Sequence, residues 1–86
     1  MNEKELATTL AKNLDGSFEI LVRIYQNRLY SFALRLSHNK QDAEDIAQEA
    51  FVRAYQALKS YSQDRIEVML LKPWLYKITL NVFRNR

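Results

Sequence analysis

Two stretches of the sequence carry side chains whose types and spacing suit binding partners. The first, QDAEDIAQEAFVRAYQAL, begins at Gln41, and residues 41–50 hold four carboxylates and no lysine or arginine. The second, residues 72–86, holds four basic side chains and no acid. Carboxylates suit a basic protein surface, whereas cations and amides suit the phosphates and base edges of nucleic acid. Although the net charge is only +3, this segregation of charge predicts two unlike partners.

The acidic stretch has two explanations. Asp42 and Glu44 lie in the first turns of a predicted helix, where a carboxylate gains roughly 0.3–1 kcal/mol from the helix dipole. That explanation does not extend to the polar side chains further along the same helix. Because residues three and four apart are surface neighbours, these side chains form one stripe. The stripe consists of Asp45, Gln48, Glu49, Val52 and Gln56. It is either a solvated helix face or a docking surface.

The basic stretch also has two explanations. Arg84 lies near the end of a predicted helix, where the dipole favours cations, but Lys77 is too far from that end. Lys77, Asn81 and Arg84 share one helix face at spacings i, i+4 and i+7, an arrangement that suits contacts to a nucleic-acid backbone and to base edges. Tyr61 and Tyr76 could stack on an unpaired base, although a large ring taken singly more often fills a small core.

The inventory for catalysis is poor. The chain has no cysteine, and His38, in a predicted loop, is its only histidine, so nucleophile–base pairs and zinc sites lack their parts. No glycine-rich turn is present to cradle a phosphate. Asp42, Asp45 and Glu49 lie in a predicted helix, whereas calcium sites need irregular backbone with carbonyl ligands. We therefore expect no enzyme activity, no catalytic residue, no metal and no cofactor.

Helices must position these side chains. A chain of 86 residues that is 48% apolar, with one glycine and one proline, predicts a single all-α domain. No apolar run reaches the roughly 18 residues of a membrane span, and the polar start does not fit a signal peptide. Together with the absence of cysteine, these features predict a cytoplasmic protein with no membrane partner.

Apolar periodicity predicts a small helical bundle of three long helices plus a short N-terminal helix. The four helices are expected at residues 2–13, 18–37, 40–61 and from Pro73 onward. The motif NLDGS is predicted to separate the first two, with Gly16 as a C-cap and Ser17 as an N-cap. Asn39 is the predicted N-cap of the third helix. Residues 62–71 fit no clean period and are predicted to be a loop that collapses onto the core.

The segment DAEDIAQEAFVRAYQAL, followed later by WLYKITLNVFRNR, resembles the second conserved region of bacterial sigma factors, most closely the extracytoplasmic-function group. The upstream FEILVRIYQNRLYSFALRLS resembles the preceding helix of that region, so the resemblance covers residues 17–86. The matching positions are Asp42-Ala43-Glu44-Asp45, Gln48, Phe51, Trp74-Leu75, Ile78 and Asn81. The chain departs from the pattern at Leu71, where many relatives carry Phe, and at Asn85, where Asp is frequent.

The resemblance implies a role for each surface. In that family, the helix with the Asp-Ala-Glu-Asp motif docks on the clamp helices of the RNA polymerase beta-prime subunit. The expected polymerase-binding residues are Asp45, Gln48, Glu49, Val52 and Gln56. The last helix and the segment before it open the promoter minus-ten element and hold an unstacked base of the single-stranded non-template strand. The expected DNA-binding residues are Tyr61, Arg65, Lys72, Tyr76, Lys77, Asn81 and Arg84. Trp74 is expected to belong to the core.

The resemblance also bears on domain organisation. The family continues through a linker to a second DNA-binding domain, so we expect residues 1–86 to be an isolated sigma factor region 2 domain that lacks this linker and second domain. An anti-sigma factor is a common partner in the group. The alternative interpretation is a helical protein–protein adaptor without DNA binding, in which the acidic stripe docks and the basic end is merely capped. An enzyme fragment is a third, weaker alternative.

Overall fold

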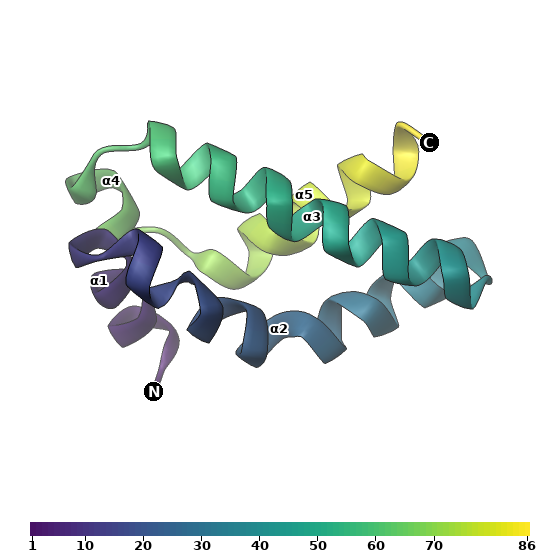
Figure 1. Ribbon diagram of the computed structural model, residues 1–86, viewed down its shortest axis with the longest axis horizontal. Coiled ribbons are helices and arrows are strands. Elements are labelled where there is room, and N and C mark those ends of the chain that lie inside the picture. Colours follow the sequence, from purple (N-terminus) through teal and green to yellow (C-terminus); the bar gives the residue numbers. More distant parts are fainter.

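The chain forms five helices and no strand (Figure 1). The computed structural model describes all residues, Met1–Arg86. The helices are α1 (Glu3–Lys12), α2 (Leu14–Ser37), α3 (Lys40–Ser60), α4 (Gln63–Glu67) and α5 (Leu71–Arg84). The predicted all-α bundle of three long helices and a short N-terminal helix is therefore confirmed, with α4 as an addition. None of the five helices combines the length and apolar character that crossing a bilayer requires.

The three long helices pack against one another, and α1 and α4 close one end of the bundle (Figure 1). Their shared core contains the fully buried Leu21 and Leu29 of α2, Ile46 of α3 and Leu75 of α5. A buried side chain of this size contributes roughly 1.5–3 kcal/mol relative to an exposed one. The small residues on the inner face of α3 allow its neighbours to approach closely. They are Ala43, Ala47, Ala50 and Ala54.

The junction between α1 and α2 differs from the prediction. Helix α2 begins at Leu14, because the Oδ1 of Asn13 accepts a hydrogen bond from the N–H of Gly16 at 3.1 Å and caps the helix there. Gly16 is thus in the first turn of α2 and is not a C-cap, and Ser17 is buried inside the helix and is not an N-cap. Asn ranks beside Ser as an N-cap, and here the earlier residue starts the helix. A Cβ on Gly16 would lie 2.3 Å from Nδ2 of Asn13, so glycine lets this cap close.

Replacing Asn13 by alanine tests this cap. The variant Asn13→Ala is expected to lose about 1 kcal/mol of unfolding free energy, which lowers Tm by about 4–8 °C in a domain of this size. Thermal unfolding followed by circular dichroism measures the change. The neighbouring Lys12→Ala removes an exposed side chain and should shift stability by less than about 0.5 kcal/mol. Equal Tm values for the two variants would contradict the assignment of Asn13 as the cap.

The predicted loop at residues 62–71 is wrong in its first half, which forms α4. The hydroxyl of Ser62 accepts a hydrogen bond from the N–H of Arg65 at 3.1 Å, and Ile66 is buried in the core. A helix of five residues is too short to produce an apolar period, which explains why the sequence pattern does not reveal it. Helix α5 then begins at Leu71, two residues before the predicted start, with Pro73 in its first turn.

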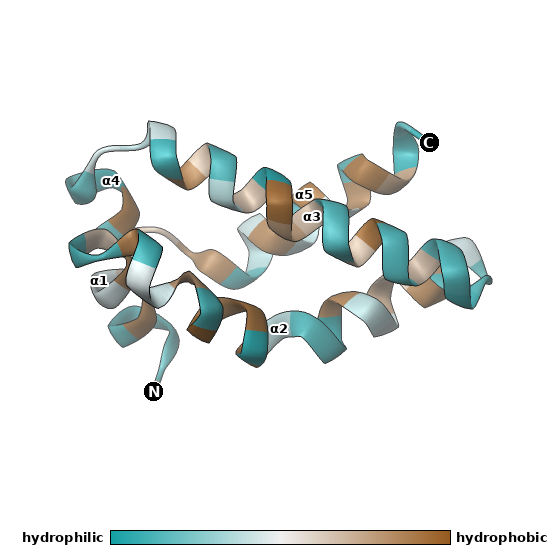
Figure 2. Cartoon of the chain, viewed as in Figure 1, coloured by the Kyte–Doolittle hydropathy of each residue, from teal (hydrophilic) through white to brown (hydrophobic).

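The collapse predicted for the second half of this segment is only partial. Met69 and Leu71 turn toward the core, but Val68 is 79% exposed and Leu70 is 72% exposed. The apolar colouring of the connection that leads into α5 is visible in Figure 2. Two apolar side chains therefore remain in solvent directly ahead of the basic helix.

Tyr55 connects the C-terminal part of α3 to the start of α2. Its hydroxyl donates a hydrogen bond to the carboxylate of Asp15, and its ring meets that of Phe18 edge-on at 5.2 Å between centroids. The hydrogen bond to Asp15 is the largest cause, and desolvation the second, of a pKa of the Tyr55 hydroxyl above its usual value. The donor proton that this connection needs is therefore retained throughout the neutral pH range.

Candidate functional site

The outer side of α3 carries the polar stripe expected from the sequence. Gln48, Val52 and Gln56 are exposed, and Asp45 and Glu49 are partly exposed. Val52 is 55% exposed, so an apolar side chain stands in the middle of a polar surface. We call these five residues the docking stripe. It offers carboxylates and amides arranged around one apolar contact point.

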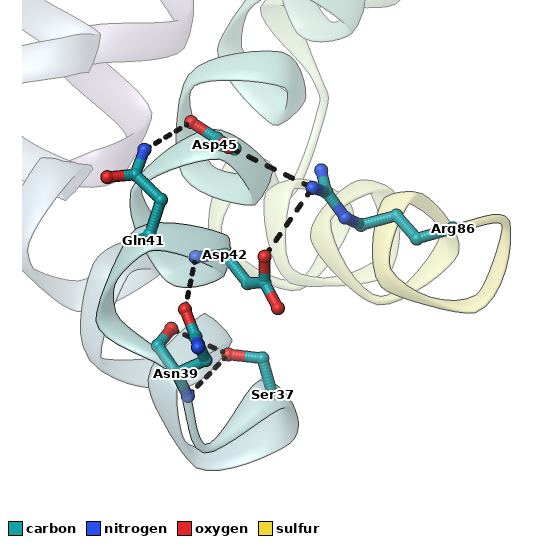
Figure 3. A network of polar contacts seen from close by, with 6 residues as sticks. All are labelled: Ser37, Asn39, Gln41, Asp42, Asp45 and Arg86. Carbon is teal, nitrogen blue, oxygen red and sulfur yellow. Dashed lines mark hydrogen bonds and ion pairs between the residues drawn. The ribbon is translucent and has the colours of Figure 1, made fainter.

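The N-terminal end of the docking stripe joins a polar network at the start of α3 (Figure 3). The Oδ1 of Asn39 accepts a hydrogen bond from the N–H of Asp42 at 2.9 Å, which confirms the predicted N-cap. Asp45 accepts a hydrogen bond from the side chain of Gln41 at 3.2 Å. Arg86 lies 3.9 Å from the carboxylates of both Asp42 and Asp45. Because partly exposed ion pairs are weak, a cation on a partner can compete with Arg86 for Asp45.

Glu49 is also paired within the chain. Its carboxylate lies 2.7 Å from the guanidinium of Arg53, one turn along α3. Such an exposed i, i+4 pair contributes about 0.3–0.5 kcal/mol, so a partner's cation can replace Arg53 at little cost. The carboxylates of the docking stripe are thus oriented by weak internal ion pairs and can still pair with the cations of a partner.

The outer side of α5 carries unpaired cations, as the sequence predicts. Lys77, Asn81 and Arg84 are all exposed and follow one another along one side of the helix. Neither Lys77 nor Arg84 takes part in any of the ion pairs of the chain. We call these three residues the α5 basic face. It presents two charged donors and an amide to the solvent.

Tyr61, expected to contact DNA, stands at the end of α3 with a cation on its ring. The guanidinium of Arg65 lies 3.6 Å from the centroid of the Tyr61 ring, and the ring of Trp74 lies 6.3 Å from it. Trp74 is half-buried and packs against the core, in keeping with the role expected for it. Arg65 therefore occupies the place on Tyr61 that a stacked base would take, and a base must either displace Arg65 or stack on it.

Lys72 and Tyr76 lie on the other side of α5, toward α1 and α2. The backbone N–H of Lys72 donates a hydrogen bond to the carboxylate of Glu3 at 2.7 Å. This bond fixes the backbone of Lys72, whose side chain is exposed. The ring of Tyr76 packs on Phe32 of α2 with centroids 4.9 Å apart. Apart from the α5 basic face, the expected DNA-binding residues thus fall into two further groups. Tyr61 and Arg65 lie where α3 meets α4, and Tyr76 lies at the seam between α2 and α5.

The sequence pattern does not single out two residues that matter for this geometry. Thr79 is fully buried, and its hydroxyl is satisfied by donating to the carbonyl of Leu75 at 2.8 Å. Its spacing to Leu75 and Val82 is the signal that could have placed it inside. Glu3, in contrast, accepts a hydrogen bond from Lys72, which is 69 residues away in the sequence. No local sequence pattern predicts such a contact.

Comparisons with known proteins identify the family of the chain. Residues 21–86 match the family model described as Sigma-70 region 2. The chain therefore belongs to the sigma-70 region 2 family, and its relatives confirm the expected resemblance to the extracytoplasmic-function group. The members of this family are transcription factors and not enzymes.

Three similar proteins illustrate the match. The RNA polymerase sigma-H factor of Pseudomonas aeruginosa is 32% identical over 83 residues, which cover 96% of this chain and 41% of that protein. The ECF RNA polymerase sigma factor SigW of Bacillus subtilis is 35% identical over 83 residues, or 96% of this chain and 42% of that protein. An NMR structure of an engineered region 2 of sigmaE in complex with GTAAAA matches 99% of this chain and 84% of its own, with 30% identity and a TM-score of 0.78. The chain spans less than half the length of the two curated relatives.

Proposed function

We propose that residues 1–86 form the polymerase-docking and promoter-recognition module of an extracytoplasmic-function sigma factor in the bacterial cytoplasm. The observation that carries the proposal is that α3 and α5 turn unlike surfaces outward, the acidic docking stripe on one and the α5 basic face on the other. The similarity to a sigmaE region 2 that was solved with GTAAAA supports DNA as one of the two partners.

The docking stripe binds the clamp helices of the polymerase beta-prime subunit. Asp45 and Glu49 pair with cations of the partner, Gln48 and Gln56 exchange hydrogen bonds, and Val52 supplies the apolar contact. Charges at such an interface fix orientation and accelerate association more than they raise affinity. An anti-sigma factor that covered the same stripe would block docking.

The α5 basic face binds the non-template strand of the minus-ten element. Lys77 and Arg84 neutralise phosphates, which positions the strand without reading its sequence. Asn81 carries an amide, which can form paired hydrogen bonds with the edge of an adenine. The division of work predicts that affinity depends on the two cations and sequence preference on the amide.

The segment ahead of α5 holds the base that leaves the stack. Taking a base out of a duplex costs a few kcal/mol, and stacking on an aromatic ring returns roughly 1–3 kcal/mol per base. Tyr61 with Arg65 on its face provides the stacking surface, and the exposed Val68 and Leu70 provide apolar contacts beside it. This placement fits a single strand, because the neighbours of a base inside a duplex cover both of its faces and it must leave the stack before it can lie on a ring.

Titration of fluorescent oligonucleotides tests the proposal. We expect the chain to bind a single strand that contains GTAAAA about tenfold more tightly than a scrambled strand of equal length and composition, since one well-placed amide contact discriminates by about 1–3 kcal/mol. The complementary strand serves as a second control. A protein–protein adaptor instead predicts equal binding to all three strands, with affinity set by salt alone, and that result would overturn the DNA-binding half of the proposal.

A further inference from the structure

A second cationic surface lies between α2 and α5, apart from the docking stripe and the α5 basic face. It is a shallow, open hollow of about 560 Å³. Its lining residues are Asn27, Arg28, Ser31, Leu34, Arg35 and Tyr76. Five of these six carry hydrogen-bond donors and none is acidic, so the lining suits an anion more than an apolar ligand.

The two arginines of this hollow have no carboxylate partner. The guanidinium of Arg28 lies 5.8 Å from the Tyr25 ring, and that of Arg35 lies 6.0 Å from the Phe32 ring. Neither forms an ion pair, whereas Arg23, five residues before Arg28 on the same helix, pairs with Glu19 at 2.6 Å. The aromatic rings orient the guanidiniums but do not neutralise their charge, so both remain available to an external anion.

The hollow adjoins a cation of α5 at one end. Arg28 also lines a neighbouring hollow with Lys72, where the only carboxylate, that of Glu3, accepts the N–H of Lys72. At the far end of α2, Ser37 lines a separate hollow with Arg84, Arg86 and the carboxylate of Asp42. Helices α2 and α5 therefore run in the same direction, with cations along their seam. Arg28 and Arg35 are about 10 Å apart along the axis of α2.

We propose that this hollow is a second binding site for the sugar–phosphate backbone of single-stranded DNA, with Arg28 and Arg35 each binding a phosphate and Ser31 donating a hydrogen bond between them. A planar guanidinium matches a phosphate through two parallel hydrogen bonds. The Tyr76 ring, which lies on Phe32, forms the wall on the α5 side. The inference rests on the proposed function, because it extends the path of the same strand from α5 onto α2.

A length series of oligonucleotides tests the extension. Fluorescence anisotropy would compare a strand of GTAAAA alone with strands that carry thymidine arms on the 5′ or the 3′ side. For the unsubstituted chain, one of the two arms is expected to increase affinity. For Arg28→Ala/Arg35→Ala, that increase disappears, the armed strand binds about tenfold more weakly, and the slope of log K against log salt falls by about 1.4, the value for two phosphate contacts to a single strand. Binding of the short strand and preference over a scrambled sequence stay unchanged, because phosphate contacts carry no sequence information.

The matched control is Lys12→Ala/Arg23→Ala, which removes the same net charge from exposed positions on α1 and α2 outside the hollow. It is expected to leave the effect of the arm intact. If Arg28→Ala/Arg35→Ala binds the armed strand as the unsubstituted chain does, or no more weakly than the control, the second site is wrong while the proposed function stands. The hollow would then suit an acidic protein surface. If the unsubstituted chain shows no preference for GTAAAA, the proposed function fails, and the inference fails with it.

Discussion

The triple substitution Lys77→Ala/Asn81→Ala/Arg84→Ala is expected to weaken binding of the GTAAAA strand by about 100-fold at 0.1 M salt. Two terms combine in this estimate. Loss of the Asn81 amide removes about 1–3 kcal/mol of base discrimination. Loss of Lys77 and Arg84 removes two phosphate contacts, each of which contributes about 0.7 to the salt slope of a single strand. All three side chains are exposed, so the fold should not change, and circular dichroism checks this.

Partial variants separate the two terms. Asn81→Ala alone should relax the preference for GTAAAA over a scrambled strand and leave the salt slope unchanged. Lys77→Ala/Arg84→Ala should lower the slope by about 1.4 and leave the preference unchanged. The Lys12→Ala/Arg23→Ala control matches the double variant in charge and should differ little from the unsubstituted chain. Equal losses in the double variant and this control would mean that DNA responds only to net charge, and the α5 basic face would lose its assigned role.

The parts of the fold that the sequence predicts are those with a long, regular period. Helices α2 and α3 span 24 and 21 residues, and each carries enough repeats of the apolar pattern to identify its buried face. The N-cap Asn39 was predictable because its motif is local. Helix α4 has too few residues to show an apolar period. The cap at Asn13 was not predicted because Gly16, three residues later, resembles the C-cap of the preceding helix.

The candidate surfaces were predictable for the same reason. Lys77, Asn81 and Arg84 lie on one helix, so their relative positions follow from the helical repeat alone. The contacts that join different helices were not predictable. Examples are the tether between Glu3 and Lys72 and the approach of Arg86 to Asp42. The seam between α2 and α5 depends on tertiary packing in the same way, because nothing local to Arg28 or Arg35 places them beside Tyr76.

The second large effect is expected on polymerase docking. The variant Gln48→Ala/Glu49→Lys should weaken binding to isolated clamp helices of the beta-prime subunit by about 100-fold. Truncating Gln48 leaves a partner group without its hydrogen bond, which costs about 1–3 kcal/mol. Reversing the charge of Glu49 places a cation opposite the cations of the partner, and like charges at an interface cost several kcal/mol. The new lysine also lies near Arg53, whose guanidinium is 2.7 Å from the Glu49 carboxylate in the unsubstituted chain.

The structure provides a close control for this variant. Glu19→Lys/Gln63→Ala breaks an equivalent i, i+4 bridge, that to Arg23, and truncates an exposed glutamine outside the docking stripe. Both double variants lose a few tenths of a kcal/mol of helix stability, so they should melt alike and differ only in clamp binding, measured by isothermal titration calorimetry. Because the residues proposed for docking and for DNA binding are different side chains on different helices, Gln48→Ala/Glu49→Lys should still prefer the GTAAAA strand over its scrambled control. Unchanged clamp binding in this variant would remove the docking stripe from the interface and leave α3 with an ordinary solvated face.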